Sequence, residues 1–430
     1  ALHNDTGASA WTALPNVTTS SSAAAVPTAV ATPFTDVGIG TITANWGANG
    51  GTRWRVQIST ASDFSTINES SVTDNTYAVF GTSVTIGTLI RLSTNTLYYF
   101  QVQSTNSVSG AVSAFLNLGS TSTYAHAVNA TPAATLLSST TAGLAWAANT
   151  NPAGTTYRVQ LATSSNFSTV AAASSTLNTS TTFFSLASNT PYFQRVVAVS
   201  LAGNATSYSV TITTATNPAA PTASAYTLVR ISSLTANFGS STNLTPGTTF
   251  TIELSSTSAI ATTDTSYSSA AIFSATNFTS TSVVFGTGGG VSVALAPNTT
   301  HYSRVTALGY AGTNAVVSLS SVSTLAAQPV VATATPTVTT LMIGWSTASN
   351  PSPLTTYYVE ISTSSSFATL NSTQLVVTSY TVLSGLLSNT TYYNRVRAIN
   401  HDGVFTAYST LAATSTLAAA PVNVGTQPLG

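Results

Sequence analysis

The sequence predicts an all-β chain that forms a tandem array of β-sandwich domains. Three observations lead to this fold class. Apolar and polar residues alternate in short stretches rich in β-branched and aromatic residues, which is typical of half-buried strands. One motif recurs four times, roughly every hundred residues. Pro-containing joints separate the units, at Pro27, Pro132, Pro221, Pro329 and Pro421.

The recurring motif has the form Leu-x-x-Asn-Thr, followed by aromatic residues and a Val. Its copies are LSTNTLYYFQVQS from Leu92, LASNTPYFQRVVA from Leu186, LAPNTTHYSRVTA from Leu295 and LLSNTTYYNRVRA from Leu386. The Asn residues of the motif are Asn95, Asn189, Asn298 and Asn389, so successive copies lie 94, 109 and 91 residues apart. Short strands and frequent turn signals in a unit of this length predict a β-sandwich.

Two further motifs precede each copy. One is an alternating stretch such as WRVQI, in which Trp54, Val56 and Ile58 are expected on one face of a strand and Arg55 and Gln57 on the other. The other motif carries a large aromatic residue that we expect in the core of each unit. These four residues are Trp46, Trp146, Phe238 and Trp345.

Together these motifs resemble the fibronectin type III domain, an immunoglobulin-like sandwich, and the resemblance covers nearly the whole chain. In that family the Leu and the Tyr of the recurring motif form a tyrosine corner between two strands. The resemblance implies this role for Tyr98, Tyr192 and Tyr392, whereas the third repeat has His301 instead. The motif STSxxF and the linker sequence STLAA are most similar to repeats of large bacterial surface or secreted proteins.

The motifs divide the chain into complete and partial units. Complete repeats are expected at residues 23–122, 123–216, 217–325 and 326–418. Residues 1–22 resemble the G-strand end of a preceding repeat, since residues 1–14 align without a gap with residues 398–411, and residues 419–430 resemble the start of a following repeat. A lone edge strand leaves backbone groups unpaired. We therefore expect residues 1–22 to pair with protein outside residues 23–418.

The repeats also alternate in type. Repeats one and three share a TAN-aromatic-Gly stretch from Thr43 and Thr235, and repeats two and four share an Asn-Pro insertion from Asn151 and Asn350. The larger repeating element is therefore a pair of domains. We call repeats one and three odd-type and repeats two and four even-type.

Composition argues against several functions. Only 4% of residues are charged, all nine basic residues are Arg, and nine acidic residues balance them. Because phosphate recognition needs clustered basic residues, no nucleic-acid partner is expected. There is no Cys, and no apolar run of about 18 residues predicts a membrane span. The four His residues lie far apart and are expected in turns or at strand edges, so neither a metal, nor a cofactor, nor an enzyme activity is predicted.

The outward face of one strand in each later repeat combines aromatic residues with Arg. Either this is a solvated sheet face with stacked side chains, or it is a contact surface, since Tyr and Arg favour interfaces. The candidate contact residues are Phe193, Arg195, Tyr302, Arg304, Tyr393, Arg395 and Arg397.

The scarce charges vary together on the strands that neighbour each other in the fibronectin fold. Glu253 matches Arg304 and Glu360 matches Arg395, whereas repeats one and two have no Glu at this position. We expect both pairs to form ion pairs across the outer sheet face.

Twelve Asn-x-Ser/Thr triplets offer acceptors for sugars. A chain this rich in Ser and Thr produces such triplets by composition alone, so a glycan coat and chance are both open readings. Representative candidates are Asn68, Asn166, Asn277 and Asn371.

These features predict an extracellular or cell-surface structural protein that forms a fibre, a filament or a surface array. The expected partners are copies of itself or neighbouring repeats of the same long chain, and glycan is a further candidate. The alternatives are an adhesin or binding module that grips a glycan or a protein through its loops, or a spacer in a large secreted enzyme or phage tail.

Overall fold

The computed structural model confirms the predicted fold class, because its strands form four β-sandwiches and its described residues include no α-helix. The structure describes residues 23–81, 83–85, 88–106, 109–128, 130–135, 137–244, 247–261, 273–286, 292–310 and 312–422. The expectations for residues 1–22, and for the part of 419–430 beyond residue 422, lie outside these ranges.

The chain divides into two compact units. The first consists of residues 1–135, 143–183 and 192–214, and the second of residues 136–142, 184–191 and 215–430. The first and second sandwiches supply the first unit. The second unit holds the third and fourth sandwiches together with two short segments from the second repeat.

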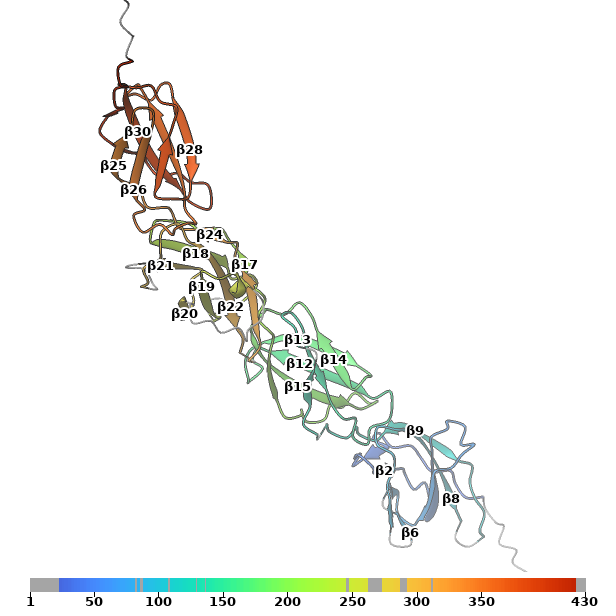
Figure 1. Ribbon diagram of the computed structural model, residues 1–430. Coiled ribbons are helices and arrows are strands. Elements are labelled where there is room, and N and C mark those ends of the chain that lie inside the picture. The colour runs from blue at the N-terminus through green and yellow to red at the C-terminus, as the bar shows by residue number, and fades with distance from the viewer. Residues whose placement is uncertain are drawn as a thin grey trace, which may run out of the picture. The chain divides into compact units, whose positions relative to one another are not determined.

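Each sandwich packs a three-stranded sheet against a larger one (Figure 1). In the first sandwich the small sheet has the order β1 (Phe34–Thr35), β2 (Ile42–Asn45), β5 (Tyr77–Phe80). Its large sheet has the order β4 (Glu69–Thr73), β3 (Arg53–Ser59), β8 (Leu97–Thr105), β9 (Leu116–Ser122). A separate hairpin pairs β6 (Ser83–Thr85) with β7 (Thr88–Ile90).

The second sandwich repeats this topology. Its small sheet has the order β10 (Ala133–Thr135), β11 (Ala142–Ala145), β14 (Ser180–Phe183). Its large sheet has the order β13 (Val170–Thr176), β12 (Thr156–Ala162), β15 (Pro191–Val199), β16 (Ile212–Ala215).

The third sandwich has the small sheet β17 (Thr222–Ala223), β18 (Ser233–Gly239), β21 (Ser282–Gly286). Its large sheet has the order β20 (Phe273–Phe278), β19 (Thr249–Ser255), β22 (Thr300–Leu308), β23 (Asn314–Ser318), with β24 (Val322–Ser323) also on β22. A single turn of 3-10 helix, η1 (Ser258–Ala261), follows β19.

The fourth sandwich has the small sheet β25 (Val330–Pro336), β26 (Leu341–Ser346), β29 (Tyr380–Leu383). Its large sheet has the order β28 (Ser372–Val376), β27 (Thr356–Ser362), β30 (Thr391–Ile399), β31 (Ser409–Thr410), with β32 (Thr414–Ser415) also on β30.

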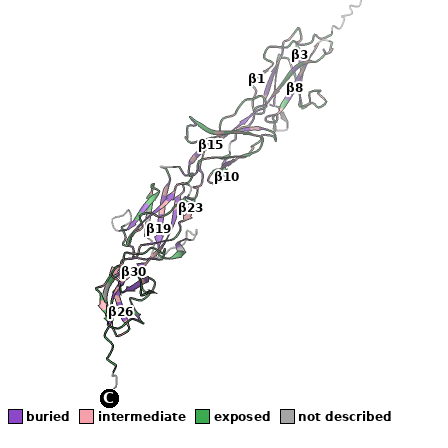
Figure 2. Cartoon of the chain, turned by 90° about the horizontal axis from the view of Figure 1, so that it is seen from above, coloured by how far each residue is buried: buried purple, intermediate pink, exposed green. Residues whose placement is uncertain are grey.

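Alternating burial along the central strands places the core between the sheets (Figure 2). The two central strands of each large sheet pair antiparallel through buried aliphatic residues, for example Val56 opposite Val102 and Val359 opposite Val396. The four aromatic residues expected in the cores, Trp46, Trp146, Phe238 and Trp345, are all buried.

An aromatic pair joins the two sheets at the same place in each sandwich. The Trp46 ring lies 6.1 Å from Trp54, and the Trp345 ring lies 5.3 Å from Tyr357. The corresponding pairs in the other sandwiches are Trp146 with Tyr157 and Phe238 with Phe250. Burying such rings contributes roughly 2–3 kcal/mol each, so these pairs are a principal source of core stability.

The tyrosines of the recurring motif are buried at the sandwich ends. The Ser93 backbone N–H donates to the Tyr98 hydroxyl at 3.0 Å, and the Leu387 N–H donates to the Tyr392 hydroxyl at 2.9 Å. Tyr192 is also buried. The hydroxyls of Tyr98 and Tyr392 thus make the contact of the tyrosine corner that the family resemblance implies.

His301 corrects one sequence-based expectation, because it lies inside β22 and not in a turn or at a strand edge. It is 3% exposed, and neither ring nitrogen has a hydrogen-bond partner among the described residues. Burial lowers the pKa of its imidazole to about 4. His301 stands at the motif position that Tyr98 and Tyr392 occupy in the first and fourth repeats, and these residues also face the core.

The buried His301 should make the third sandwich sensitive to acid. The unfolded chain takes up a proton as pH falls below about 6.5, whereas the folded ring stays neutral until pH is near 4. Stability is therefore lost across this window, by about 2–3 kcal/mol near its lower end. An NMR titration of the His rings should show one ring with a midpoint near 4, which His301→Phe removes. A midpoint near 6.5 for that ring would contradict the assignment.

Candidate functional site

Arginine side chains stack between aromatic rings on the outer face of the large sheets. In the second sandwich the Arg195 guanidinium lies 3.9 Å from the ring centroids of both Phe167 and Tyr208. It also donates two hydrogen bonds, of 2.9 and 2.7 Å, to the Gln160 side-chain oxygen. Phe167 ends the ATSSNF stretch, which matches STSSSF at Ser362–Phe367 in the fourth repeat, so the turn that follows β12 supplies one of the two covering rings.

The fourth sandwich extends the same arrangement. The Arg395 guanidinium lies 4.1 Å from the Phe367 centroid and 3.9 Å from that of Tyr408. Arg397 lies 3.6 Å from the Phe405 centroid. Such contacts contribute about 0.5–1 kcal/mol each at exposed sites. These guanidinium groups are therefore engaged within their own sandwich, and a role in binding a partner stays a prediction.

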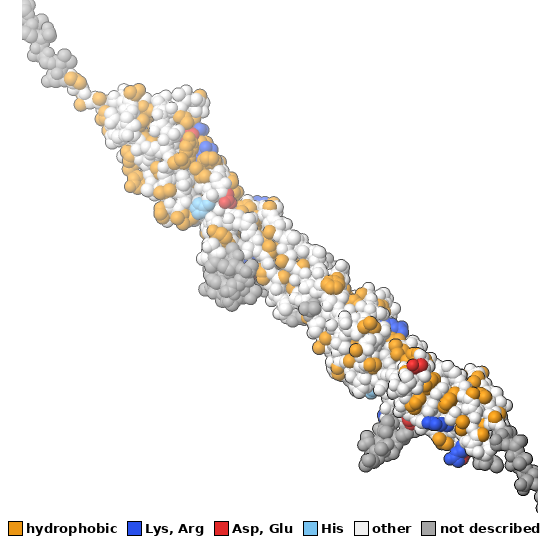
Figure 3. All heavy atoms as spheres, turned by 90° about the vertical axis from the view of Figure 1, so that its right-hand side faces the viewer, with side chains coloured by type: hydrophobic (Ala, Val, Ile, Leu, Met, Phe, Trp, Pro, Cys, Tyr) orange, Lys and Arg blue, Asp and Glu red, His pale blue; other side chains and the backbone are white. Residues whose placement is uncertain are grey.

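The other candidate contact residues belong to three different sandwiches. Phe193, Tyr302 and Tyr393 are half-buried on the outer faces of three different sandwiches, and Arg304 is buried. Figure 3 shows how sparse charged side chains are on the face it presents.

The two predicted ion pairs are present, in the predicted register. Glu253 of β19 lies opposite Arg304 of β22, and Glu360 of β27 lies opposite Arg395 of β30. Arg304 pairs with Glu253, and the Arg395 Nε lies 2.5 Å from a Glu360 oxygen. Arg304 is 5% exposed and Glu360 4%, so each pair has one nearly buried member. Loss of a partner therefore costs more than it does for a surface pair.

Neutral groups replace the ion pair at this position in the first two repeats. The Gln101 amide donates to Gln57 at 2.8 Å, and Gln160 accepts from Arg195 as described. Every repeat thus pairs the polar groups at this one cross-strand position, with or without charge.

The candidate glycosylation residues are all exposed. Asn68 and Asn371 occupy matching turns, and each side-chain oxygen accepts the backbone N–H of the first residue after the preceding strand, Thr60 at 2.6 Å and Thr363 at 2.7 Å. Asn166 and Asn277 are also on the surface. Their exposure leaves the prediction of attached sugar open.

The Asn of the recurring motif forms a hydrogen-bonded joint between consecutive sandwiches. In the first unit Asn95 is 3% exposed, and its amide donates to the Thr155 hydroxyl of the next sandwich at 2.9 Å. Its oxygen accepts from the Leu201 backbone N–H at 2.8 Å. The Thr155 hydroxyl in turn donates to the Pro152 carbonyl at 2.8 Å, so the bond extends into a short chain.

The second unit contains the same joint between its third and fourth sandwiches. The Asn298 amide donates to the Thr355 hydroxyl at 2.9 Å and accepts from the His401 backbone N–H at 2.8 Å. The Asp402 carboxylate accepts the Ser323 N–H at 2.7 Å and the Ser323 hydroxyl at 3.1 Å. Two sandwiches are thereby joined through side chains as well as through the covalent linker.

Asn189 makes an equivalent set of bonds within the second unit. Its amide donates to the Thr248 hydroxyl and to the Leu308 carbonyl, both at 3.0 Å. Its oxygen accepts from the Tyr310 backbone N–H at 3.1 Å. All three Asn residues adopt a positive φ of 46–48°, a conformation that Asn tolerates better than most residues.

A second Asn forms hydrogen bonds with the linker that leads into the second, third and fourth sandwiches. Asn151 accepts the His126 N–H at 2.7 Å and donates to the His126 carbonyl at 2.8 Å. Asn350 makes the same two bonds to Ala327, and Asn243 makes them to Ala219. Each amide therefore pairs with one linker peptide like a short strand, which fixes where the chain enters the next sandwich.

Sequence reasoning recognised the recurring Asn but assigned it no function. The signal that points to a role is the presence of Asn in all four motifs. A turn that needs only a positive φ also accepts Gly, so the repeated choice of Asn indicates that its side chain is used. The linker-binding Asn of the even-type repeats was read only as part of an insertion.

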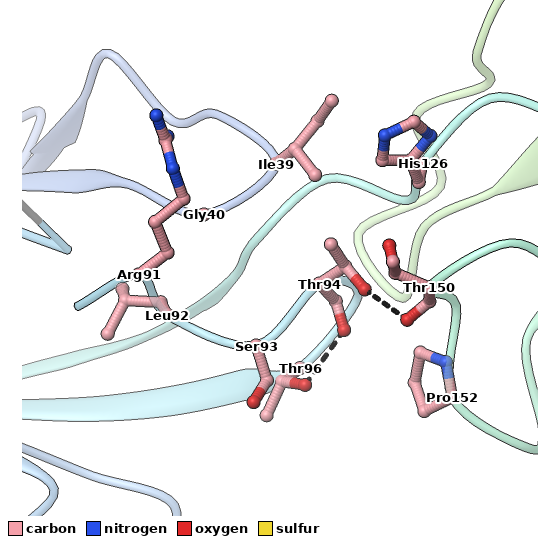
Figure 4. A pocket seen from close by; sticks show the side chains of 10 residues that line it. All are labelled: Ile39, Gly40, Arg91, Leu92, Ser93, Thr94, Thr96, His126, Thr150 and Pro152. Carbon is pink, nitrogen blue, oxygen red and sulfur yellow. Dashed lines mark hydrogen bonds between the residues drawn. The ribbon is translucent and has the colours of Figure 1, made fainter. Parts of the chain in front are cut away.

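A hollow of about 730 Å³ lies beside the joint of the first unit (Figure 4). Arg91, Thr94 and His126 are among its lining residues, and the Thr94 hydroxyl donates to the Thr150 carbonyl at 2.7 Å. No acid–base or nucleophile pair is placed together there. It is a gap between packed loops.

The described part of the chain contains no group of three or more His, Cys, Asp or Glu residues that could hold a metal ion. Within the same part, no helix is long and apolar enough to cross a membrane.

Comparison with known proteins supports the family resemblance for one repeat. Residues 326–412 match the fibronectin type III domain. The chain is 16% identical to the FN1–FN3 domains of chicken CNTN1, covering 67% of this chain and 97% of that one, with a TM-score of 0.20. It is 14% identical to a two-domain fibronectin type III segment of chicken tenascin, covering 44% and 98%, with a TM-score of 0.28. No curated protein matches the chain.

The ion pair of the fourth sandwich can be tested with a control that the chain itself suggests. Glu360→Gln should be mild, because it recreates the Arg195–Gln160 arrangement of the second sandwich. Glu360→Leu leaves the Arg395 guanidinium without this acceptor and should destabilise the fourth sandwich by about 2–3 kcal/mol. This cost is below that of breaking a fully buried pair, because 24% of the Arg395 side chain is exposed to water. Hydrogen exchange of β27 and β30 in the whole chain measures the effect. Equal protection in the two variants would refute the proposed role of the pair.

Proposed function

We propose that this chain is a structural protein of the cell surface or the extracellular space, in which tandem sandwiches act as a spacer that builds a fibre, a filament or a surface array. The observation that carries this proposal is the repeated joint, in which a buried Asn binds a Thr and a backbone N–H of the following sandwich. The sequence motifs STSxxF and STLAA favour an origin in a large bacterial surface or secreted protein.

The joints also help to choose between a spacer and a binding module. Binding modules on this fold commonly use the loops at one end of the sandwich to grip a ligand. In the second and fourth sandwiches these loops carry Thr155 with Leu201 and Thr355 with His401, and they are occupied by the joint. This use of the loops supports a spacer at both positions.

The scarcity of charge supports association with neutral partners. Neutral hydrogen bonds depend little on salt, whereas exposed ion pairs are screened. With a net charge of zero, little repulsion opposes lateral packing of copies. We accordingly propose copies of the same protein as the main partners, and neither an enzymatic activity nor a cofactor.

The alternative of an adhesin is best supported at the first sandwich. Its end loops border an open hollow lined by Gly50, Gly51, Thr52, Thr105 and Asn106. A glycan or a protein that binds there would favour that second function.

The spacer function predicts that Asn95 restricts motion between the first two sandwiches. The chain has no Cys, so spin labels can be placed at Val72→Cys and Leu177→Cys, two exposed positions in these sandwiches. Asn95→Gly keeps the positive φ and removes the amide. It leaves the Thr155 hydroxyl and the Leu201 N–H without this partner, at a cost of about 1–3 kcal/mol for the buried Thr155.

Pulsed electron–electron double resonance should give a narrow distribution of distances between the two spin labels in the labelled parent. The distribution should be clearly broader in Asn95→Gly. Asn178→Gly, at an exposed turn of the second sandwich, is the matched control and should leave the distribution narrow. A distribution that is already broad in the parent would refute the spacer.

A further inference from the structure

One position in the core changes from apolar to polar between the first sandwich and the later ones. In the first sandwich it is Phe100 of β8, which lies opposite Ile58 of β3. Strand pairing places three polar residues at the same position of the other large sheets: Gln194 opposite Leu161, Ser303 opposite Leu254, and Asn394 opposite Ile361. Gln194 and Ser303 are 0% exposed and Asn394 is 1% exposed, so all three side chains lie inside a core.

These three polar side chains have no hydrogen-bond partner among the described residues. Both amide atoms of Gln194, both amide atoms of Asn394 and the Ser303 hydroxyl oxygen are buried and unbonded. A primary amide offers two N–H donors and an acceptor oxygen. Burying such groups among apolar side chains without a partner costs free energy, which a hydrogen-bonding ligand inside the core would recover. Because three of the four repeats carry such a residue, a common ligand is a simpler explanation than three separate defects.

The first sandwich shows how the same position is filled without polar groups. The Phe100 ring packs on Phe34 of β1, with ring centroids 4.7 Å apart. In the fourth sandwich Ala334 stands at the position of Phe34 and Asn394 at that of Phe100. Alanine and asparagine fill less volume than two phenylalanines. The exchange therefore replaces a pair of rings with polar atoms and with room for a small molecule.

The third sandwich keeps one of the two rings and adds a hydroxyl to it. Tyr226 stands as far before the core Phe238 as Phe34 stands before Trp46, and it packs against the third core. Its hydroxyl oxygen is buried and, like that of Ser303, has no hydrogen-bond partner among the described residues. Burial raises the pKa of Tyr226 to about 12, and the nearby Ser303 hydroxyl lowers it by a smaller amount. Two hydroxyls thus face the same part of the core without bonding to each other.

We propose that the second, third and fourth sandwiches each bind an ordered water molecule inside the core, at Gln194, at Ser303 with Tyr226, and at Asn394. Water fits these sites because it both donates and accepts hydrogen bonds and is small enough for a closed core. A buried water makes about three hydrogen bonds. Strand carbonyls can supply the remaining bonds, because each keeps a second lone pair after its ladder bond. The first sandwich, with Phe100 at this position, should bind none there.

Nuclear Overhauser effects between water and side-chain amides test the proposal in the whole, unsubstituted chain labelled with ¹⁵N at Gln and Asn. The NH₂ groups of Gln194 and Asn394 should show strong effects, with the sign of a water that tumbles together with the protein. The matched control is Gln101, whose NH₂ donates to Gln57 at 2.8 Å on the outer sheet face. It should show only the weak effect of surface water. A parent in which neither Gln194 nor Asn394 contacts a bound water would overturn the proposal.

Magnetic relaxation dispersion of the solvent counts the same waters. Gln194→Leu and Asn394→Leu replace an amide with an apolar side chain of similar size, and each should lower the dispersion amplitude by about one long-lived water. Gln101→Leu is the matched control and should leave the amplitude unchanged. Folded Leu variants of both core residues that keep the full amplitude would contradict the proposal. The Overhauser measurement needs no variant, so it decides the question even where a Leu variant does not fold.

Discussion

A primary amide buried at the end of a β-sandwich needs hydrogen-bond partners that its own sandwich does not supply. Asn95 and Asn298 find those partners, a Thr hydroxyl and a backbone N–H, in the next sandwich of the chain. Each buried polar group that loses its partner costs about 1–3 kcal/mol. Separating the two sandwiches would break several hydrogen bonds at once, so opening of the joint is unfavourable. The packing of one sandwich against the next therefore depends on this side chain as well as on the linker between repeats.

The cores explain why the following sandwich presents its partners in the right place. Thr155 and Thr355 each stand two residues before a core aromatic, Tyr157 or Tyr357, which packs on the Trp of the opposite sheet. Fixing that ring fixes the start of the strand and the Thr before it. The joint and the core are consequently coupled. A substitution in the aromatic pair should therefore shift the Thr and weaken its hydrogen bond to the joint Asn. The joints rely on neutral groups almost throughout, which fits a chain with few charges.

Much of this architecture can be predicted from the sequence, because repetition reveals what each position shares. The four motifs predicted the sandwiches, the alternation in β19 and β27 predicted which residues face outward, and covariation of Glu with Arg predicted the register of β22 and β30. A periodic pattern shows which face a side chain occupies but not what it meets. The partners of Asn95 lie 60 and 106 residues away, in another sandwich. The rings around Arg395 likewise come from the turn after β27 and from the segment directly before β31, and only the fold defines how these two segments approach.

The central claim, that buried Asn amides hold the joints, is tested most directly by side-chain hydrogen exchange. NMR can follow the NH₂ groups of Asn95, Asn298 and Asn389 in one dilute sample of the whole chain. Asn389 has the same backbone conformation as the other two but an exposed side chain, so it serves as an internal reference. Slow exchange at Asn95 and Asn298 with fast exchange at Asn389 is the predicted result. Equally fast exchange at all three amides would contradict the account.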